Sequence, residues 1–432
     1  MNIKLNVRPI NLACAIFIFD CAVMPVIKLM GLSIKISYGI AFISILLLLF
    51  NFIYKRKLTY GSSNSIFIWL MTYTLLLFFG ELWSASVYGI AIRTGFFKII
   101  IGVVLMIGSL YCGYASKAKI GAIAYWSFIA NVVVNCTLAL LGRSVPSFMA
   151  RLYSVSLDTF IDGYYRNGGI IGNPNSSLLV TNMILLLVVV LYRYDKLRLS
   201  SIKLASLYLF SIAADIIVSS RGELLHTVFI LAYLTFWIFK KNDSPTKLLK
   251  KSIPIVLIIL LTVGLLWGVL AERFPNIQTS LDRMTSLDDV FDTSTEDANT
   301  ASIARPFLKF DVFFGRFKYS PIWGTGIDGG GNISAFTKGT TGYHNDFFMI
   351  LGATGIIGLI LWIKIIKKAI TKIGICMISP FIVTAISNTF IQSYFGTMLY
   401  FFIIGYVLCF KDKEAKEVCI TRRSMSKTSN KL

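Results

Sequence analysis

Long apolar stretches separated by short polar ones run along most of the chain. A stretch of about 20 residues with almost no charge matches the hydrocarbon core of a membrane. Inside lipid the backbone must satisfy its own hydrogen bonds, so these stretches are expected to be helices. They lie approximately at 11–30, 33–54, 66–82, 95–115, 120–142, 175–192, 204–219, 222–239, 252–272, 343–363, 373–390 and 395–410. The pattern predicts an all-α polytopic membrane protein with about 12 transmembrane helices and one large periplasmic loop.

These spans divide the chain into six predicted segments. They are the N-terminal helices 1–5 at residues 1–142, a periplasmic loop at 143–174, helices 6–9 at 175–272, the large periplasmic loop at 273–342, helices 10–12 at 343–410 and a basic cytoplasmic tail at 411–432. A connection of about 70 residues needs a structure or a function of its own. The first span has no small-residue cleavage site after it, so we expect it to be retained.

Composition agrees with a membrane protein, since 56% of the 432 residues are hydrophobic, 15% are charged and the mean hydropathy is +0.73. The formal net charge of +21 suggests nucleic acid at first sight. However, most of the 42 lysines and arginines fall in alternate loops, which is the positive-inside pattern. This pattern predicts that both termini are cytoplasmic and that the long loops lie outside. It argues against a nucleic-acid partner, because the charges follow topology and form no single patch.

The seven cysteines provide no sign of a disulfide framework, since none lies in a long external loop. No CxxC pattern or Cys/His cluster is present, so no metal site and no cofactor is predicted.

His344 stands at the mouth of a predicted span, in "HNDFFMILGATGIIG". On a helix it shares a stripe with Phe348, Leu351, Gly355 and Gly358. The two glycines would let another helix approach closely on that face, so His344 is expected to point into the bundle near the outer surface. A histidine placed there could act as a base near neutral pH. The alternative is a buried histidine that only bonds a neighbouring loop.

Three arginines in external segments could bind phosphate, since the guanidinium offers a planar fork of donors that keeps its charge. They are Arg166 in "YYRNGGIIGNPN", Arg221 in "VSSRGELL" and Arg305 in "IARPFLKF". The alternative for Arg221 is an interfacial residue that snorkels toward water. Beside Arg166, Asn173 precedes Pro174 in a turn, where amide groups either cap the next span or reach a sugar or phosphate.

Other polar residues suggest structural roles. His226 is interpreted as a packing or helix-pairing residue. Asp215 is expected to pair with an arginine, whereas the sequence suggests no role for Asp20. Both acids would also suit a proton-coupled transporter, which uses ionisable residues inside the membrane. The "GTGIDGGGN" run at 324–332 predicts turns, and a flexible linker is favoured over a phosphate-binding loop.

Taken in order, the motifs "RNGGIIGNPNSS", "SSRGELL", "ARPFLKFDVFFGRFKYSPIWGTG" and "HNDFFMILGATGIIG" resemble the O-antigen ligase and polymerase superfamily of bacterial membrane glycosyltransferases. The resemblance covers approximately residues 166–363. It implies a metal-independent transferase of the bacterial inner membrane, whose donor is a glycan on a polyprenyl diphosphate. It also implies that His344 takes the place of the family's histidine, with Asn345 beside it, and that Arg221 and Arg305 hold the diphosphate, with Arg166 and Asn173 in the loop motif nearby.

Three functions remain open on these residues. The first is a polysaccharide polymerase that joins lipid-linked repeat units, and it is favoured because the aromatic residues after His344 and Asn345 resemble those of polymerases. The second is a ligase that moves the finished chain onto lipid A–core. The third is a non-enzymatic flippase or transporter, for which inverted repeats with broken helices would be expected and are not seen in the sequence. The implied partners are a polyprenyl-diphosphate-linked oligosaccharide, membrane lipid and a chain-length regulator protein.

Overall fold

The computed structural model describes the chain in separate ranges. They are residues 9–25, 27–29, 32–55, 63–88, 95–116, 119–141, 147–148, 160–161, 164–165, 169–171, 174–218, 220–241, 250, 253–254, 257, 317–318, 320–326, 346–384 and 394–429.

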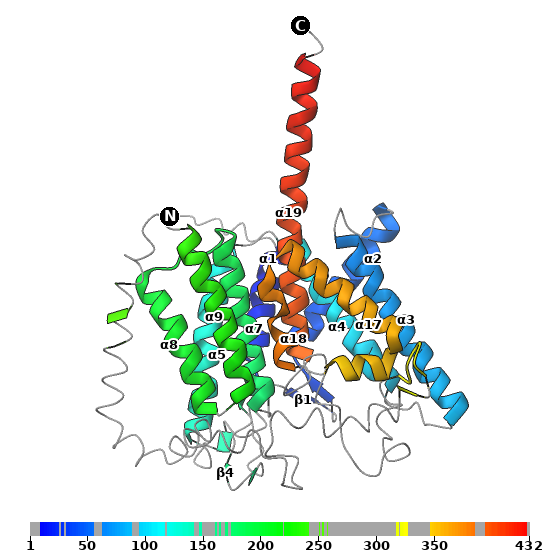
Figure 1. Cartoon of the computed structure of the whole chain (residues 1–432), viewed down its shortest axis with the longest axis horizontal. Helices are drawn as coiled ribbons and strands as arrows, with labels where there is room; N and C mark the ends of the chain where they lie inside the picture. Colours follow the sequence, from blue (N-terminus) through cyan, green and yellow to red (C-terminus); the bar gives the residue numbers. More distant parts are fainter. Residues whose placement is uncertain are drawn as a thin grey trace.

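The described part is a bundle of helices with two very short antiparallel hairpins (Figure 1). The helices are α1 (Pro9–Ala22), α2 (Ile36–Lys55), α3 (Ser63–Tyr88), α4 (Gly95–Ala115), α5 (Gly121–Leu141), η2 (Gly169–Ile171), α7 (Pro174–Arg193), α8 (Ser201–Val218), α9 (Arg221–Lys241), α17 (Asp346–Lys372), η4 (Ile375–Ile378), α18 (Ser379–Thr384) and α19 (Tyr394–Ser429). Strand β1 (Ile27–Leu29) pairs with β2 (Leu32–Ile34), and β3 (Phe160–Ile161) pairs with β4 (Tyr164–Tyr165).

Within the described residues, eight helices are long and apolar enough to cross a membrane: α2, α3, α5, α7, α8, α9, α17 and α19. The predicted all-α polytopic membrane fold is therefore confirmed, while the number of twelve spans is not. Two predicted spans differ in extent. The first, predicted at 11–30, ends as a helix at Ala22, and the β1–β2 hairpin follows. The one predicted at 373–390 begins with the short helices η4 and α18. The span at 252–272 lies almost wholly outside the described residues.

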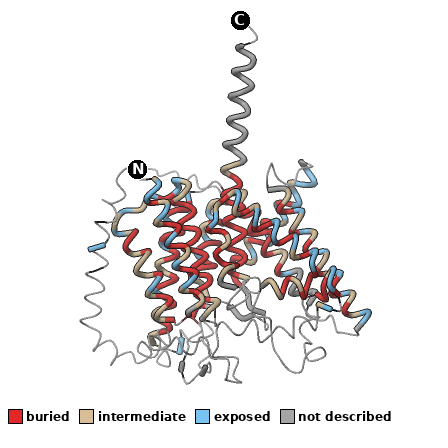
Figure 2. The backbone as a smooth tube through the Cα atoms, in the orientation of Figure 1, coloured by how far each residue is buried: buried red, intermediate tan, exposed pale blue. Residues whose placement is uncertain are grey.

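The centre of the bundle is α7, which contacts α1, α5, α8, α9 and α19. In its most apolar window 89% of the residues are buried, whereas in the peripheral helix α2 only 22% are (Figure 2). On α2 the side chains of Phe50 and Ile53 are 64% and 77% exposed. Apolar side chains exposed in this way are typical of a surface that faces lipid.

Glycines allow α4 to pack tightly between its neighbours. A Cβ atom at Gly108 would overlap the backbone of Ala41 on α2, and one at Gly113 would overlap Phe402 on α19. Gly405 on α19 has the same relation to Leu110 on α4. Small residues at such crossings bring backbones close together, which is how membrane helices gain van der Waals contact. The six cysteines whose side chains are described are free thiols.

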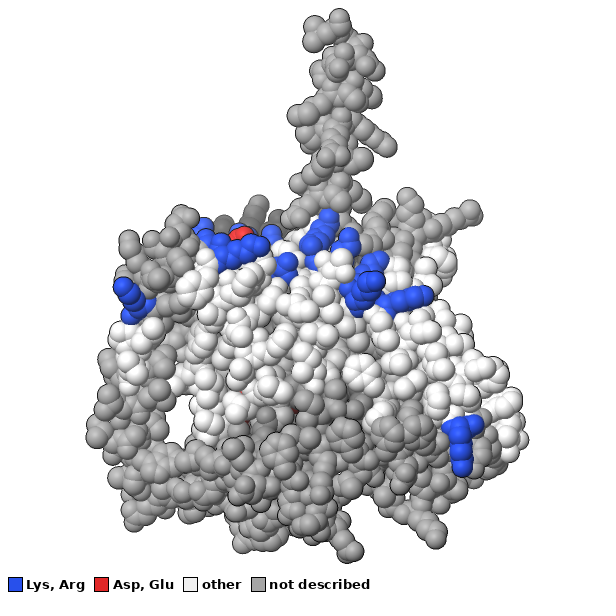
Figure 3. All heavy atoms as spheres, viewed as in Figure 1, with Lys and Arg blue, Asp and Glu red and all other residues white. Residues whose placement is uncertain are grey.

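The two ends of the bundle differ in polarity. α19 projects from one face, and most of the described Lys and Arg side chains gather there, around the C-termini of α7 and α9 (Figure 3). The N-termini of α7 and α9 lie at the opposite end. We call that opposite end, with Asn131, Asn135, Asn182, Glu223 and His226 buried near it, the polar end.

Candidate functional site

Most of the predicted site residues lie outside the described residues. These are His344, Asn345, Arg166, Asn173 and Arg305. Arg221 is the first residue of α9, and its side chain is not described. The predicted roles of all six therefore remain predictions. The described residues show instead how the helices that carry or flank them are held at the polar end.

The first turn of α9 is bonded to α7 on both sides of Arg221. The Ser220 hydroxyl donates to the Asn175 side-chain oxygen at 3.1 Å, and the Ser220 carbonyl accepts from Leu224 N–H at 3.1 Å. Ser220 and Glu223 have the spacing of a capping box, in which the two side chains would bond to the helix's own backbone. Here both side chains are used for contacts with α7. The α9 N-terminus, and with it the backbone of Arg221, is thus fixed beside the N-terminus of α7.

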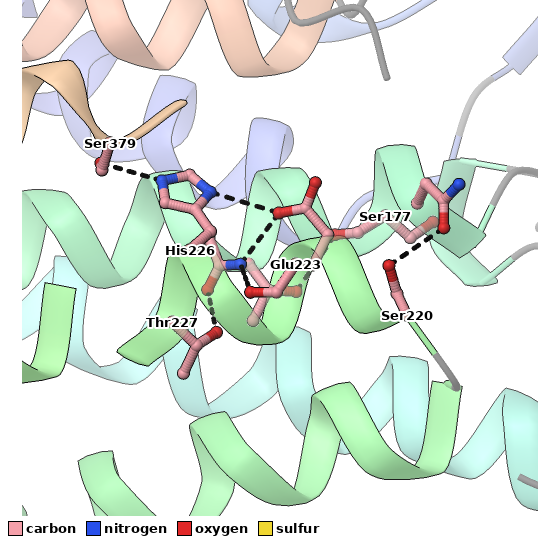
Figure 4. A network of polar contacts seen from close by, with 9 residues as sticks. Ser177, Ser220, Glu223, His226, Thr227 and Ser379 are labelled. Atoms are coloured by element: carbon pink, nitrogen blue, oxygen red, sulfur yellow. Dashed lines mark hydrogen bonds and ion pairs between the residues drawn. The ribbon is translucent and has the colours of Figure 1, made fainter. Parts of the chain in front are cut away.

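Glu223 and His226 form a buried chain that reaches α18 (Figure 4). Oε2 of Glu223 lies 3.2 Å from Nδ1 of His226, and Nε2 of the same ring lies 2.9 Å from Oγ of Ser379. Glu223 is 2% exposed, while His226 and Ser379 are fully buried. His226 therefore links α9 to α18, in keeping with the helix-pairing role expected for it.

The order of these three groups is that of an activated serine nucleophile, because an acid orients a histidine that contacts a hydroxyl. A nucleophile must touch its substrate, and Ser379 has no exposed surface. The chain is better explained as an interhelical connection, in which buried polar groups satisfy one another's hydrogen bonds.

Asn182 on α7 completes the contact with α9. Its amide nitrogen donates to the Glu223 carbonyl at 3.1 Å and to Glu223 Oε2 at 3.0 Å. Its side-chain oxygen accepts from the Thr227 hydroxyl at 2.7 Å. Both amide hydrogens and the amide oxygen are therefore bonded to α9, which makes Asn182 the main polar link between the two helices.

Asp215 on α8 is also buried, with 1% exposure. Its Oδ2 atom has no hydrogen-bond partner in the part of the chain that the structure describes. The expected partner was an arginine, and among the described side chains none is bonded to this atom. The Thr227 hydroxyl on α9 is a described hydrogen-bond partner of the Asp215 carboxyl group, and Ser220 N–H donates to the Asp215 carbonyl at 3.1 Å.

A second polar network holds the segment that precedes α7. The side-chain oxygen of Asn135 on α5 accepts from Ile170 N–H in η2 at 3.0 Å, and its nitrogen donates to Asn131 at 3.1 Å. Asn131 also accepts from the Thr181 hydroxyl and donates to the Ala22 carbonyl, each at 2.5 Å. Thus α1, α5, η2 and α7 are bonded together just before the described chain enters α7.

Asp20, which lacked an explanation in the sequence, has a structural role. Its carboxylate accepts from Ser37 N–H at 2.7 Å, so it caps the N-terminus of α2 from another helix. The Lys35 ammonium donates to the Asp20 carbonyl at 3.0 Å and lies 4.4 Å from the centre of the Phe395 ring.

The helix α17, which follows His344, is broken at Gly355 (φ 62°, ψ −164°). Such a backbone conformation is essentially restricted to glycine. The turn Ser320–Gly326 fits into the break. Thr325 and Gly326 N–H donate to the carbonyls of Gly352 and Ala353, each at 2.9 Å. Two amides beyond the break, those of Ile356 and Ile357, donate back to the turn's carbonyls at 3.0 and 3.3 Å.

Three predictions are wrong at this break. Gly355 admits a turn and not another helix, because a Cβ there would overlap the backbone of Ile322 and Trp323. The stripe from His344 to Gly358 is not one helical face, since the helix is interrupted within it. The sequence showed no broken helix, yet α17 is one. Glycine permits this conformation, and the interruption is visible only when the turn that satisfies the freed backbone groups is in place.

The turn itself is anchored, whereas a flexible linker was favoured for the glycine run. Gly324 and Gly326 have φ of +77° and +79°, and Ser84 on α3 donates to the Thr325 carbonyl at 2.5 Å. Trp323 packs edge-on against Phe79 and Trp83 of α3, with ring centroids 5.4 and 5.6 Å apart. The rest of the glycine run, residues 327–332, lies outside the described residues.

The described polar residues form no metal centre. No group of three or more His, Cys, Asp and Glu side chains suited to a metal ion occurs in the ranges that the structure describes. The polar end is instead rich in amides and hydroxyls, which bond to one another across helices.

The fold and its polar end define a polytopic α-helical membrane protein with an interior network at one end. A family model described as O-antigen ligase matches residues 206–363 of this chain. The matched region contains α9, the turn Ser320–Gly326 and the break in α17. The match confirms the predicted resemblance to the O-antigen ligase and polymerase superfamily. It supports ligase- or polymerase-type activity in general, in a multi-pass bacterial membrane protein, without distinguishing the two. No curated protein and no solved structure matches the chain.

Several residues that build the polar end were not singled out in the sequence, above all Asn182, Glu223, Asn131 and Asn135. A signal was available, because polar and ionisable side chains inside apolar spans are costly and therefore face protein. The sequence could not say which of them meet, since their partners lie on helices up to 153 residues away, as for His226 and Ser379.

Proposed function

We propose that the chain is a polysaccharide polymerase for O-antigen or capsule. It transfers a glycan from polyprenyl diphosphate onto the next lipid-linked repeat unit at the periplasmic face of the inner membrane. The observation that carries this proposal is that the matched family region includes the start of α9, where Arg221 stands, and that buried polar contacts fix this start beside α7.

The proposed reaction needs few protein groups. A hydroxyl of the acceptor attacks the anomeric carbon, the bond from that carbon to the diphosphate oxygen breaks, and the diphosphate leaves with the bonding electrons. Arg221 and Arg305, with Arg166, Asn173 and Asn345 nearby, are proposed to neutralise and orient the diphosphate and its glycan. His344 is proposed to take the proton of the attacking hydroxyl. Because arginines supply the positive charge, we propose that the reaction needs no metal ion.

The topology follows from the charge distribution. The face where Lys and Arg gather is proposed to be cytoplasmic, as the positive-inside rule predicts, and both termini with it (Figure 3). The polar end is then periplasmic. The proposed segments, with loops at 143–174 and 273–342 and a cytoplasmic tail at 411–432, follow the same topology. A chain-length regulator protein is a further proposed partner at the outer face.

The experiment is an extension assay. Purified protein with a lipid-diphosphate repeat unit is expected to lengthen it, and His344→Ala is expected to slow extension by about 10²–10⁴-fold, because it removes the base. Arg221→Lys is expected to be impaired as well, since lysine cannot form a bidentate fork. Unimpaired extension by His344→Ala would remove the histidine from the mechanism, and loss of extension on chelation would contradict metal independence.

The acceptor separates the polymerase from the ligase. Deleting the gene in its host should leave single repeat units on lipid A if the protein is the polymerase. A total absence of attached units would support the ligase, which transfers the glycan to lipid A–core.

One observation favours the third candidate, a flippase. A broken membrane helix such as α17 is common in transporters. In proteoliposomes a flippase would move a labelled lipid-linked glycan between leaflets without extending it, and extension without such movement would exclude it.

A further inference from the structure

The start of α9 makes several polar contacts with α7 that are separate from the capping of its own backbone. A helix start leaves four backbone amides unpaired, and one capping side chain usually satisfies one of them. Here Ser220 and Glu223 at the start of α9, and Thr227 one turn further along, all bond to residues on α7. The contacts are therefore directed at fixing α9 relative to α7.

The amide nitrogen and the amide oxygen of Asn182 are both bonded to α9. An asparagine side chain has two N–H donors and one oxygen acceptor, and all of them go to α9. Since the amide is 1% exposed, loss of one bond would leave a buried polar group unpaired. The register between α7 and α9 is thus strongly specified at this one position.

Glu223, which accepts a hydrogen bond from Asn182, also connects α9 to a third helix. Glu223 Oε2 accepts from Asn182 and lies 3.2 Å from His226, which contacts Ser379 on α18 (Figure 4). The connection therefore runs from α7 through α9 to α18 without a gap. A helix held from both sides cannot rotate about its axis without breaking a buried bond.

Arg221 lies in the first turn of α9, two residues before Glu223. At about 1.5 Å rise per residue, its backbone is about 3 Å along the axis from Glu223. A rotation or a shift of the first turn that displaces Glu223 must therefore displace Arg221 by a similar amount.

We propose that Asn182, Glu223 and His226 are positioning residues for Arg221. They hold the start of α9 so that the guanidinium meets the diphosphate of the donor. The inference rests on the proposed function, in which Arg221 binds that group. None of the three residues touches the substrate, and they act only through the place of the arginine. Misplacing a binding group by about 1 Å can cost up to about 10²-fold in rate.

A double-mutant cycle in the extension assay tests the proposal. Asn182→Leu is expected to lower kcat/KM about 10-fold or more, mainly through a higher KM for the lipid-diphosphate donor. In the Arg221→Ala background the same change should cost less than about 2-fold, because the group it positions is already gone. Equal losses in both backgrounds would overturn the proposal.

Glutamate variants separate position from charge. Glu223→Gln keeps a hydrogen-bonding side chain of the same length between Asn182 and His226, so kcat/KM should fall less than about 3-fold. Glu223→Leu removes the link and should match Asn182→Leu. Equal and large losses in both glutamate variants would point to the negative charge and contradict positioning.

Asn51→Leu is the matched control. Asn51 on α2 donates to the Tyr111 hydroxyl on α4 at 2.6 Å, so the variant also removes an interhelical amide bond. It should leave kcat/KM within about 2-fold of the wild type. A loss as large as that of Asn182→Leu would show that any lost interhelical bond has this effect, and would overturn the proposal.

Hydrogen exchange provides a readout that needs no turnover. Without substrate, Asn182→Leu should speed amide exchange in residues 224–227, the first α9 amides that are bonded within the helix, and Asn51→Leu should not. Unchanged exchange in Asn182→Leu would overturn the proposal whatever the assay gives. If the Arg221→Ala variant extends the donor as fast as the wild type, the proposed function of the arginine fails, and the positioning role fails with it. If hydrogen exchange changes and Arg221→Ala is impaired, but the effects in the double-mutant cycle are additive, only the positioning inference fails.

Discussion

Two regions toward the same end of the bundle connect the chain in opposite ways (Figure 1). Between α7 and α9 the helices are regular, and polar side chains such as Asn182, Glu223 and His226 join them. At the break in α17 the helix itself is interrupted, and backbone groups of the turn Ser320–Gly326 bond to backbone groups of α17. The first region depends on side-chain chemistry. The second depends on the absence of a side chain at Gly355.

Because of this difference, the two regions are expected to tolerate different amino-acid substitutions. A side-chain network survives a substitution that keeps donors and acceptors in place, and fails when an apolar residue leaves its partners unpaired. A backbone network is insensitive to most side chains, but it fails when a Cβ atom enters the space or a special φ/ψ is lost. Each region also belongs to a helix with a predicted site residue at or before its start: Arg221 is the first residue of α9, and His344 precedes α17 in the sequence by two residues.

The largest effect is expected from Gly355→Ala. The new residue would be strained at φ 62°, and its Cβ would overlap the Ile322 carbonyl. The free energy of unfolding in detergent, measured by chemical denaturation, should fall by about 4 kcal/mol. Gly39→Ala on α2 is the control, since a Cβ there meets nothing within 4 Å, and alanine in a helix should stabilise by up to about 1 kcal/mol. Equal effects at the two glycines would contradict the role of the break.

A smaller effect is expected from His226→Leu. The change leaves Ser379 Oγ without its imidazole partner and reduces the bonds to Glu223. Unfolding should become easier by about 2 kcal/mol, since buried polar groups lose partners. For comparison, Lys241→Met at the other end removes the ion pair with Asp195, whose side chain is 86% exposed, together with a bond to the Tyr192 carbonyl at 2.8 Å, and should cost about 1 kcal/mol. If the two variants lose the same stability, the buried network is no stronger than a surface pair.

The smallest effect is expected from Thr325→Val, in the second region. It removes a hydroxyl that donates to the Gly352 carbonyl at 3.1 Å, but the Thr325 amide still donates to the same oxygen. The loss in unfolding free energy should stay below about 1 kcal/mol. A loss as large as that of Gly355→Ala would show that the turn relies on its side chain, which would remove the contrast between the regions.

The sequence predicted the all-α membrane class well, because apolar length is a local property of the chain. It also placed the resemblance at residues 166–363, a stretch that includes the region 206–363 matched by the family model, while the motif at 166–177 lies outside that match. It failed at α1 and at α17, where apolar residues continue past the true helix end or across a break. Hydropathy does not distinguish a helix from an apolar hairpin or turn that packs inside protein.

The candidate site was predictable in part. Ionisable residues such as Asp20, Asp215 and Glu223 stand out in apolar spans as groups that must face protein. Their partners do not stand out. Asp20 caps α2, and Glu223 leaves the capping-box pattern of its own helix to bond Asn182. The spacing of Ser220 and Glu223 favours a capping box within α9, but the Glu223 side chain bonds to Asn182 on α7.

The amino-acid order alone is enough to establish that this chain crosses a membrane several times, and it predicts that the positive charge lies in alternate loops. Both follow from the transfer of side chains between water and lipid, which depends on composition over short lengths. Which polar groups meet inside the bundle was decided by tertiary packing. A buried donor takes whichever acceptor the neighbouring helices bring within about 3 Å, and those helices come from distant parts of the chain.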